Sequence, residues 1–179
     1  MRTPSKTNPH LLMDDLIFNQ NDIPKEQWRY GFRSSAATGC GWIATYNALR
    51  LMGYNADPQQ LIRQYEHQVP LINGNIGTVL FGPALWFRKQ GFPVKMVVDR
   101  TKFDQAAKEA DVCIIFYRWL KKYQYGAHFV ALHHTESGFV GYNTYRTSTG
   151  PDHYGTSLAG FLKRRKYFGA VLFAINRKN

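Results

Sequence analysis

Apolar residues recur at helical spacing in the first half of the chain and alternate with polar residues in much of the second half. Between residues 38 and 52 the apolar positions cover much of a helix circumference, which predicts a largely buried helix. Thr38 is a suitable N-cap for this helix, and Gly53 is a suitable residue just beyond its end. Residues 1–30 lack such a period and are predicted to form an irregular N-terminal arm.

Two shorter helices are predicted next. The stretch ADPQQLIRQYEHQ is amphipathic, with Asp57 as its cap and Pro58 at its first position. The stretch from Gly77 to Gly91 predicts another helix, which Pro83 would bend. Residues 31–92 therefore make up the helical part of the predicted structure.

Residues 93–179 are predicted to be mainly β-sheet. Short runs rich in β-branched and aromatic residues predict strands, and these runs are PVKMVV, VCIIFY, AHFVALHH, GFVGYNTY and GAVLFAI. The stretches TKFDQAAKEA and SLAGFLKRRKYF predict small helices between them. AHFVALHH and GFVGYNTY are expected to pair as a hairpin across HTESG. Helices followed by a mainly antiparallel sheet predict the α+β class.

The length of 179 residues suits one domain with a proper core, so residues 1–179 are interpreted as a single domain. No run of eighteen or more apolar residues is present, and acidic residues interrupt the N-terminal stretch where a signal peptide would be apolar. We therefore expect no membrane span and a cytoplasmic location. Cys113 falls in an apolar strand, which gives a disulfide framework no support.

The chain is strongly basic, with 23 Lys and Arg against 12 Asp and Glu and a formal net charge of +11. Such a charge attracts anionic partners over long distances, which favours an acidic peptide or protein substrate. The one dense basic run is KRRK at residues 163–166, next to the apolar side of a predicted helix. We interpret it as a solvated helix face and expect no nucleic-acid partner.

Cys40 lies between Gly39 and Gly41 where the first long helix is expected to begin. The partial positive charge and unpaired amides of a helix N-terminus favour a thiolate, and a nearby imidazolium lowers the thiol pKa further. The two glycines are expected to leave main-chain amides open to a substrate carbonyl. The alternative for a lone cysteine is a small core residue.

A reactive thiol needs a histidine that a third group holds in place. His128 is the candidate among the six histidines, because Asn143 lies in the next predicted strand. A hairpin centred between Thr135 and Glu136 would place His128 directly opposite Asn143, with side chains on the same face of the sheet. The Asn143 side chain would then accept a hydrogen bond from one ring nitrogen and leave the other for Cys40. Taken singly, the two residues also fit a strand histidine and a turn asparagine.

No metal or cofactor is expected. His133 and His134 are adjacent, so on a strand they point to opposite faces and cannot share one ion. The glycine-containing stretches carry no phosphate-loop lysine, and no dinucleotide fingerprint follows a strand.

These residues resemble the papain-like cysteine peptidase superfamily, and they are most similar to the small bacterial branch related to double-glycine leader peptidases that serve bacteriocin exporters. The resemblance covers roughly residues 35–175 through TGCGWIATYNALRLMG, IGTVLFGPALWFRKQGFPVKMV, GAHFVALHHTESGFVGYNTY and TSLAGFLKRRKYFGAVLFAI. It implies a papain-like fold with the nucleophile on a central helix. It also implies Cys40 as nucleophile, His128 as general base and acid, and Asn143 as the residue that orients the imidazole.

The chain departs from the family in two places. Family members often have Pro after the third catalytic residue, and here YNTY lacks it. Family members usually also supply an oxyanion-binding Gln about six residues before the cysteine, whereas this chain has Arg33, Ser34 and Ser35 in that region. The nearest upstream Gln is Gln27. Ser34, Ser35 and Gln27 are therefore the candidate side-chain donors, beside the amides near Gly39 and Gly41.

The leading hypothesis is a papain-like cysteine peptidase that forms a thioester on Cys40. One alternative is an acyl or peptidyl transferase that uses the same residues with an amine or thiol acceptor. Another is a non-enzymatic binding protein on the same scaffold, with a basic surface for an anionic partner and an idle Cys40.

Overall fold

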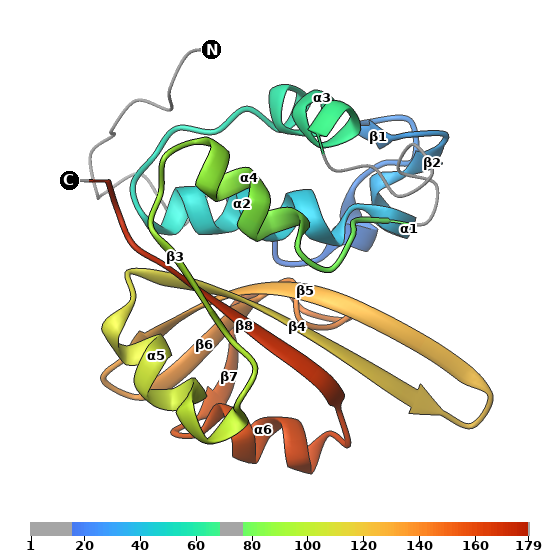
Figure 1. Cartoon of the computed structure of the whole chain (residues 1–179). Coiled ribbons are helices and arrows are strands. Elements are labelled where there is room, and N and C mark those ends of the chain that lie inside the picture. Colours follow the sequence, from blue (N-terminus) through green and yellow to red (C-terminus); the bar gives the residue numbers. More distant parts are fainter. Residues whose placement is uncertain (1–15, 69–76, 179) are drawn as a thin grey trace.

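The computed structural model of the chain describes residues 16–68 and 77–178 (Figure 1). Its helices are η2 (Gln20–Asp22), α1 (Ser35–Thr38), α2 (Cys40–Leu51), α3 (Pro58–Gln68), α4 (Gly82–Lys89), η3 (Arg100–Lys102), α5 (Phe103–Glu109) and α6 (Leu158–Arg164). Its strands are β1 (Arg29–Tyr30), β2 (Arg33–Ser34), β3 (Val94–Val97), β4 (Val112–Lys121), β5 (Gln124–Thr135), β6 (Gly138–Tyr142), β7 (Asp152–Gly155) and β8 (Phe168–Ile175).

A six-stranded sheet in the order β3-β8-β4-β5-β6-β7 forms the middle layer, and each neighbouring pair is antiparallel. Helices α2, α3 and α4 lie on one side of it and α5 and α6 on the other (Figure 1). The predicted α+β class is confirmed. Helices thus cover both faces of the sheet. The first helices of the chain cover one face, and α5 and α6, which occur between strands in the sequence, cover the other.

Both faces of the sheet are buried, so its central strands are apolar at consecutive positions. Ile114 and Phe129 belong to the core that includes α2, whereas Ile115 and Val130 belong to the core that includes α5 and α6. Consecutive strand residues point to opposite faces, which explains why VCIIFY is apolar throughout. Cys113 is fully buried, as its place in this run predicts.

The helix predicted over residues 38–52 is confirmed as α2, but it starts two residues later than predicted, and Thr38 is not its N-cap. Helix α1 ends at Thr38, whose Oγ1 donates to the Ser34 main-chain oxygen at 3.5 Å. Helix α2 starts at Cys40 after Gly39, which has φ −81° and ψ 0°. The far end agrees with the prediction, because Gly53 has φ +83° and its amide donates to the Arg50 main-chain oxygen at 2.9 Å.

Three other sequence predictions have mixed outcomes. Asp57 caps α3 as predicted, since its Oδ1 accepts from the Gln59 amide at 2.7 Å. The helix predicted from Gly77 begins only at Gly82, and Pro83 lies in its first turn rather than at a bend. Proline fits there because the first amides of a helix have no intrahelical partner. Strand β7, which the sequence pattern did not predict, forms a sheet edge beside β6.

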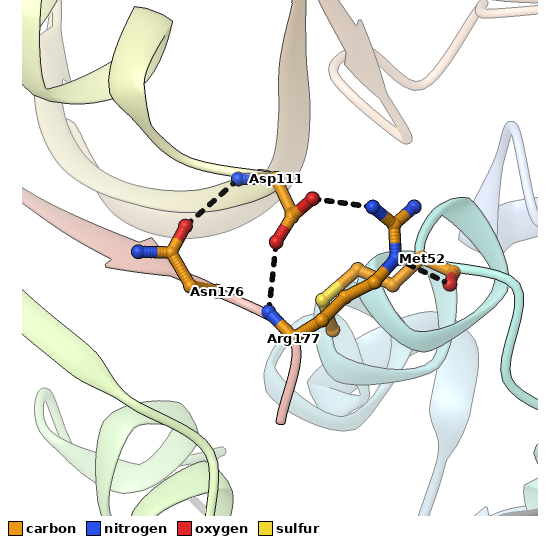
Figure 2. A network of polar contacts seen from close by, with 4 residues as sticks. All are labelled: Met52, Asp111, Asn176 and Arg177. Atoms are coloured by element: carbon orange, nitrogen blue, oxygen red, sulfur yellow. Dashed lines mark hydrogen bonds and ion pairs between the residues drawn. The ribbon is translucent and has the colours of Figure 1, made fainter. Parts of the chain in front are cut away.

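Residues just after β8 connect the C-terminal end of helix α2 to the start of β4 through hydrogen bonds and an ion pair (Figure 2). Arg177 forms an ion pair with Asp111, and its main-chain amide donates to Asp111 Oδ2 at 2.8 Å. Its Nε donates to the main-chain oxygen of Met52 at 3.1 Å, and Met52 is the C-cap of α2. A cation at this end is favourable because the last carbonyls of a helix carry partial negative charge. The Asp111 main-chain amide also donates to Asn176 Oδ1 at 3.1 Å.

Replacing Arg177 by Ala is expected to lower the free energy of unfolding by about 1 kcal/mol, because a half-exposed ion pair contributes little but the bond to Met52 is also lost. Urea unfolding followed by circular dichroism measures this change. Arg63→Ala, at an exposed position of α3, is the matched control and should stay within experimental error of the unchanged protein. Equal stability of the two variants would show that this network does not hold α2.

Candidate active site

Cys40 is the first residue of α2 and is partly exposed. Burial raises the pKa of its thiol, while main-chain hydrogen bonds from Phe129, Gly41 and Cys40 itself lower that pKa by a smaller amount. The sulfur therefore lies against the amide of Phe129 on β5. The thiol pKa is therefore raised overall, whereas the sequence predicted a lowered pKa and a preformed thiolate. The reason is that burial disfavours the charged thiolate more than the main-chain amides stabilise it.

The glycines on either side of Cys40 are needed for packing. A Cβ on Gly41 would overlap the side chain of Thr78, and a Cβ on Gly39 would meet the Ser35 oxygen and the Trp42 ring nitrogen. The Gly39 amide already donates to the Ser35 main-chain oxygen at 2.8 Å. The prediction that this amide is open to a substrate is therefore wrong. The amides of Cys40 and Gly41 point to the sulfur side instead.

Replacing Gly41 by Ala is expected to cost about 1 to 3 kcal/mol of folding free energy because the added methyl group has no space beside Thr78. The double variant Gly41→Ala with Thr78→Gly removes the overlapping atoms and should recover part of this loss. Thermal unfolding of both variants measures it. If the double variant is no more stable than the single one, Thr78 is not the cause.

His128 lies on β5, directly before Phe129, and its side chain is half-buried. It is paired with Tyr117 of β4, and the two rings are 6.2 Å apart between centroids. The predicted pairing with Asn143 is wrong. The strand ladder joins Ala131 to Tyr142, so the register is shifted by two residues and β6 ends before it reaches the level of His128.

Asn143 holds the imidazole through its main chain and not through its side chain. It leaves β6 with φ +63°, and its main-chain oxygen is 2.6 Å from His128 Nε2. A carbonyl oxygen can only accept a hydrogen bond, so Nε2 must carry the proton. In a neutral ring the other nitrogen, Nδ1, is then the basic one. The arrangement fixes the tautomer that a general base requires.

The charge state of His128 fits this tautomer. Burial lowers the pKa of His128 from its ordinary value of 6.5, the Asn143 oxygen opposes that effect, and the positive charge of Arg146 adds to it. The imidazole is therefore neutral at pH 7. With the thiol pKa raised, the resting pair is a neutral thiol and a neutral imidazole.

The Asn143 side chain is turned toward Gln20, a residue that the sequence analysis did not single out. The Gln20 amide donates to Asn143 Oδ1 at 2.8 Å, and Asn143 Nδ2 donates to Gln20 Oε1 at 3.2 Å. Gln20 lies in the segment expected to be an irregular arm. No sequence pattern relates two residues 123 positions apart, so only the fold reveals this contact.

The predicted side-chain donors for an oxyanion have other surroundings. Ser35 is fully buried, and its hydroxyl donates to the Trp28 main-chain oxygen and accepts from Trp42 Nε1. Ser34 occupies the N-cap position of α1, and Gln27 is exposed in a pocket wall beside Trp28. Ser35 is therefore excluded as a donor, because its hydroxyl proton is already used. The Cys40 amide, directed at the sulfur side, is the donor that the structure offers.

Cys40 packs against the core that includes α2, whereas His128 pairs with Tyr117, which belongs to the core that includes α5 and α6. Phe129, which contacts the sulfur through its amide, is one residue beyond His128, and the ring of His128 lies beside Tyr117. In the described part of the chain these two side chains share no hydrogen bond with each other. Among the described residues, the hydrogen bond found for the His128 ring is the one at Nε2, not at Nδ1. Catalytic hydrogen bonds are often long in free enzymes and shorten when substrate binds.

Across residues 16–68 and 77–178, no three His, Cys, Asp or Glu side chains gather closely enough to hold a metal ion. None of the helices in these ranges is both long and apolar enough to cross a bilayer. Compared with models of known protein families and with curated proteins, the chain gives no match.

Proposed function

We propose that the protein is a cysteine peptidase of papain-like architecture, with Cys40 as nucleophile and His128 as general base and acid. The observation that carries this proposal is the bond from His128 Nε2 to the Asn143 main-chain oxygen. It leaves Nδ1 as the basic nitrogen, one residue from the amide that contacts the Cys40 sulfur. The fixed tautomer of this half-buried histidine, one residue from the amide that contacts the Cys40 sulfur, supports a general base at this position.

The acylation step uses the neutral pair. His128 Nδ1 takes the thiol proton as Cys40 Sγ attacks the carbonyl carbon of the scissile peptide bond. The negative charge develops on the carbonyl oxygen, and the Cys40 amide donates to it. The tetrahedral intermediate collapses when the carbon–nitrogen bond breaks and Nδ1 returns its proton to the leaving amine. The products of this step are a thioester on Cys40 and a free amine.

Deacylation reverses the roles. Water enters after the amine leaves, and His128 Nδ1 takes a proton from it as its oxygen attacks the thioester carbon. The carbon–sulfur bond then breaks, and the proton passes from Nδ1 to the sulfur. The enzyme is restored with a neutral thiol and a neutral imidazole, and the substrate acyl group leaves as a carboxylic acid.

The surface charge favours an acidic substrate. The formal net charge is +11, and Lys163, Arg165 and Lys166 are exposed at the end of α6. Opposite charge on a substrate raises its encounter rate. This effect concerns association alone, so the proposed chemistry does not depend on it.

A peptide library digested by the purified protein and analysed by mass spectrometry tests the function. Cleavage products are expected with the unchanged protein and none with Cys40→Ala, while Cys113→Ala serves as the matched cysteine control. Adding an amine distinguishes hydrolysis from transfer, because a transferase converts the acyl group to an amide. Failure to cleave, together with Cys40 labelling that does not depend on His128, would favour a non-enzymatic binding protein.

A further inference from the structure

The segment from Leu16 to Asp22 supplies a residue that links the two halves of the site. The Gln20 main-chain amide donates to Asn143 Oδ1 at 2.8 Å, and the Gln20 side-chain Oε1 accepts from Asn143 Nδ2 at 3.2 Å. Its Nε2 also donates to the main-chain oxygen of Ala36 at 2.8 Å. Ala36 belongs to α1, four residues before Cys40. One side chain thus joins the residue that holds the imidazole to the helix that leads to the thiol.

These bonds determine where the Asn143 main chain points. Asn143 is only 2 % exposed and has φ +63°, a left-handed conformation that its neighbours must support. Its side-chain oxygen and nitrogen are both satisfied by Gln20. Without the Gln20 side chain, Asn143 Nδ2 would lose its acceptor, and only the bond from the Gln20 main-chain amide to Asn143 Oδ1 would remain. The buried amide group could then turn toward a new partner, and the peptide plane that faces His128 would turn with it.

Neighbours of Gln20 in the same segment also form hydrogen bonds to α2 and to the loop after β6, and these bonds hold Gln20 in position. Asn47 of α2 accepts from the Ile17 amide at 2.9 Å and donates to the Ile17 oxygen at 2.8 Å. Asn19 Nδ2 donates to the main-chain oxygen of Arg146 at 3.0 Å. The loop after β6 is therefore attached to α2 through the N-terminal segment and not only through the sheet.

We propose that Gln20 is a positioning residue: by holding the Asn143 side chain against α1, it keeps the Asn143 carbonyl on His128 Nε2 and Nδ1 free to accept a proton. Its effect on catalysis rests on the proposed peptidase function. Its effect on the imidazole does not, because the tautomer of His128 is measurable in the protein without any substrate.

Nitrogen NMR of the histidine rings in the full chain tests this inference, with Gln60→Ala as the matched control at an exposed position of α3. The unchanged protein and the control are expected to show His128 protonated on Nε2. Gln20→Ala is expected to show a mixture of both tautomers. Alkylation of Cys40 by iodoacetamide at pH 7.5 is expected to slow about 10- to 100-fold in Gln20→Ala, because small displacements of a catalytic group have effects of this size.

Gln20→Glu separates the two contacts and covers the case in which Gln20→Ala does not fold. In this variant the main-chain amide at position 20 still donates to Asn143 Oδ1, and the new carboxylate still accepts from Asn143 Nδ2. The carboxylate cannot donate a hydrogen bond to the Ala36 oxygen. The variant should retain the Nε2 tautomer and lose only part of the alkylation rate. An unchanged tautomer and an unchanged rate in Gln20→Ala would overturn the inference, as would loss of the tautomer in Gln20→Glu.

The two proposals fail in different ways. If the peptidase proposal is wrong, His128→Ala leaves the alkylation rate of Cys40 unchanged and no peptide is cleaved, while the tautomer in Gln20→Ala still decides the role of Gln20. If only the Gln20 inference is wrong, peptide cleavage depends on Cys40 and His128, but the tautomer does not respond to Gln20→Ala.

Discussion

Replacing His128 by Ala is expected to lower peptide cleavage about 100- to 10,000-fold, the usual contribution of a positioned general acid and base. The reason lies in the resting charge states. Burial raises the pKa of the Cys40 thiol, so little thiolate exists near pH 7 without a base. In the proposed mechanism His128 supplies that base through Nδ1, because Nε2 is bound to the Asn143 oxygen.

His134→Ala is the matched control for this prediction, since His134 is exposed on the same strand and its ring lies beside Phe139. Initial rates of peptide cleavage at pH 7.5 should be unchanged in this variant. Unfolding curves for both variants show whether the His128 side chain also stabilises the fold. A His128→Ala protein that is folded and cleaves peptide at the same rate as the His134→Ala control would contradict the assigned role.

The second large effect is the pH dependence of Cys40 alkylation by iodoacetamide. The base form of His128 is the neutral ring, which exists above its pKa, and burial places that pKa below 6.5. The rate should therefore fall about tenfold for each pH unit once the pH drops below that pKa. It should be level at neutral pH and rise again above pH 9.0, where the thiol, with its raised pKa, begins to ionise without help.

In His128→Ala the level region should disappear, and only the rise above pH 9.0 should remain. Mass spectrometry of the labelled peptides separates Cys40 from the buried Cys113, and Cys40→Ala gives the background. Alkylation that stays fast well below pH 5 in the unchanged protein would contradict a neutral pair, because it would require a preformed thiolate. Labelling with the same pH profile in both proteins would remove His128 from the site.

The sequence pattern predicts most elements of the fold but not how the site is held. The apolar period of residues 40–51 identifies α2, and the alternation on both sides of HTESG identifies the β5–β6 hairpin. The register is two residues away from the prediction. Thr135 pairs with Gly138, whose φ of +118° suits the end of a tight turn, so the turn is centred one residue later than expected. Because strand side chains alternate between the two faces, a register shift of two residues leaves each side chain on the face of the sheet that was predicted for it.

The parts that the sequence could not predict depend on contacts between distant segments. The thiol pKa follows from how deeply the start of α2 is packed, and no local motif reports that depth. The role of the Asn143 main chain follows from its left-handed conformation after β6 ends. Gln20 reaches Asn143 because Asn47 and Asn19 hold the N-terminal segment against α2 and the loop after β6. The sequence therefore suggested the residues of the candidate site, but it could not predict the hydrogen-bond partners of Asn143 and His128.

The most direct test of the account is a short cross-link between the thiol and the imidazole. A three-carbon reagent that alkylates both groups, 1,3-dibromoacetone, bridges them only if Cys40 Sγ can approach His128 Nδ1 closely. After digestion, mass spectrometry should identify a peptide pair joined through Cys40 and His128, and the pair should be absent from His128→Ala. Single alkylation of Cys40, or a bridge from Cys40 to another residue, would contradict the proposed catalytic pair.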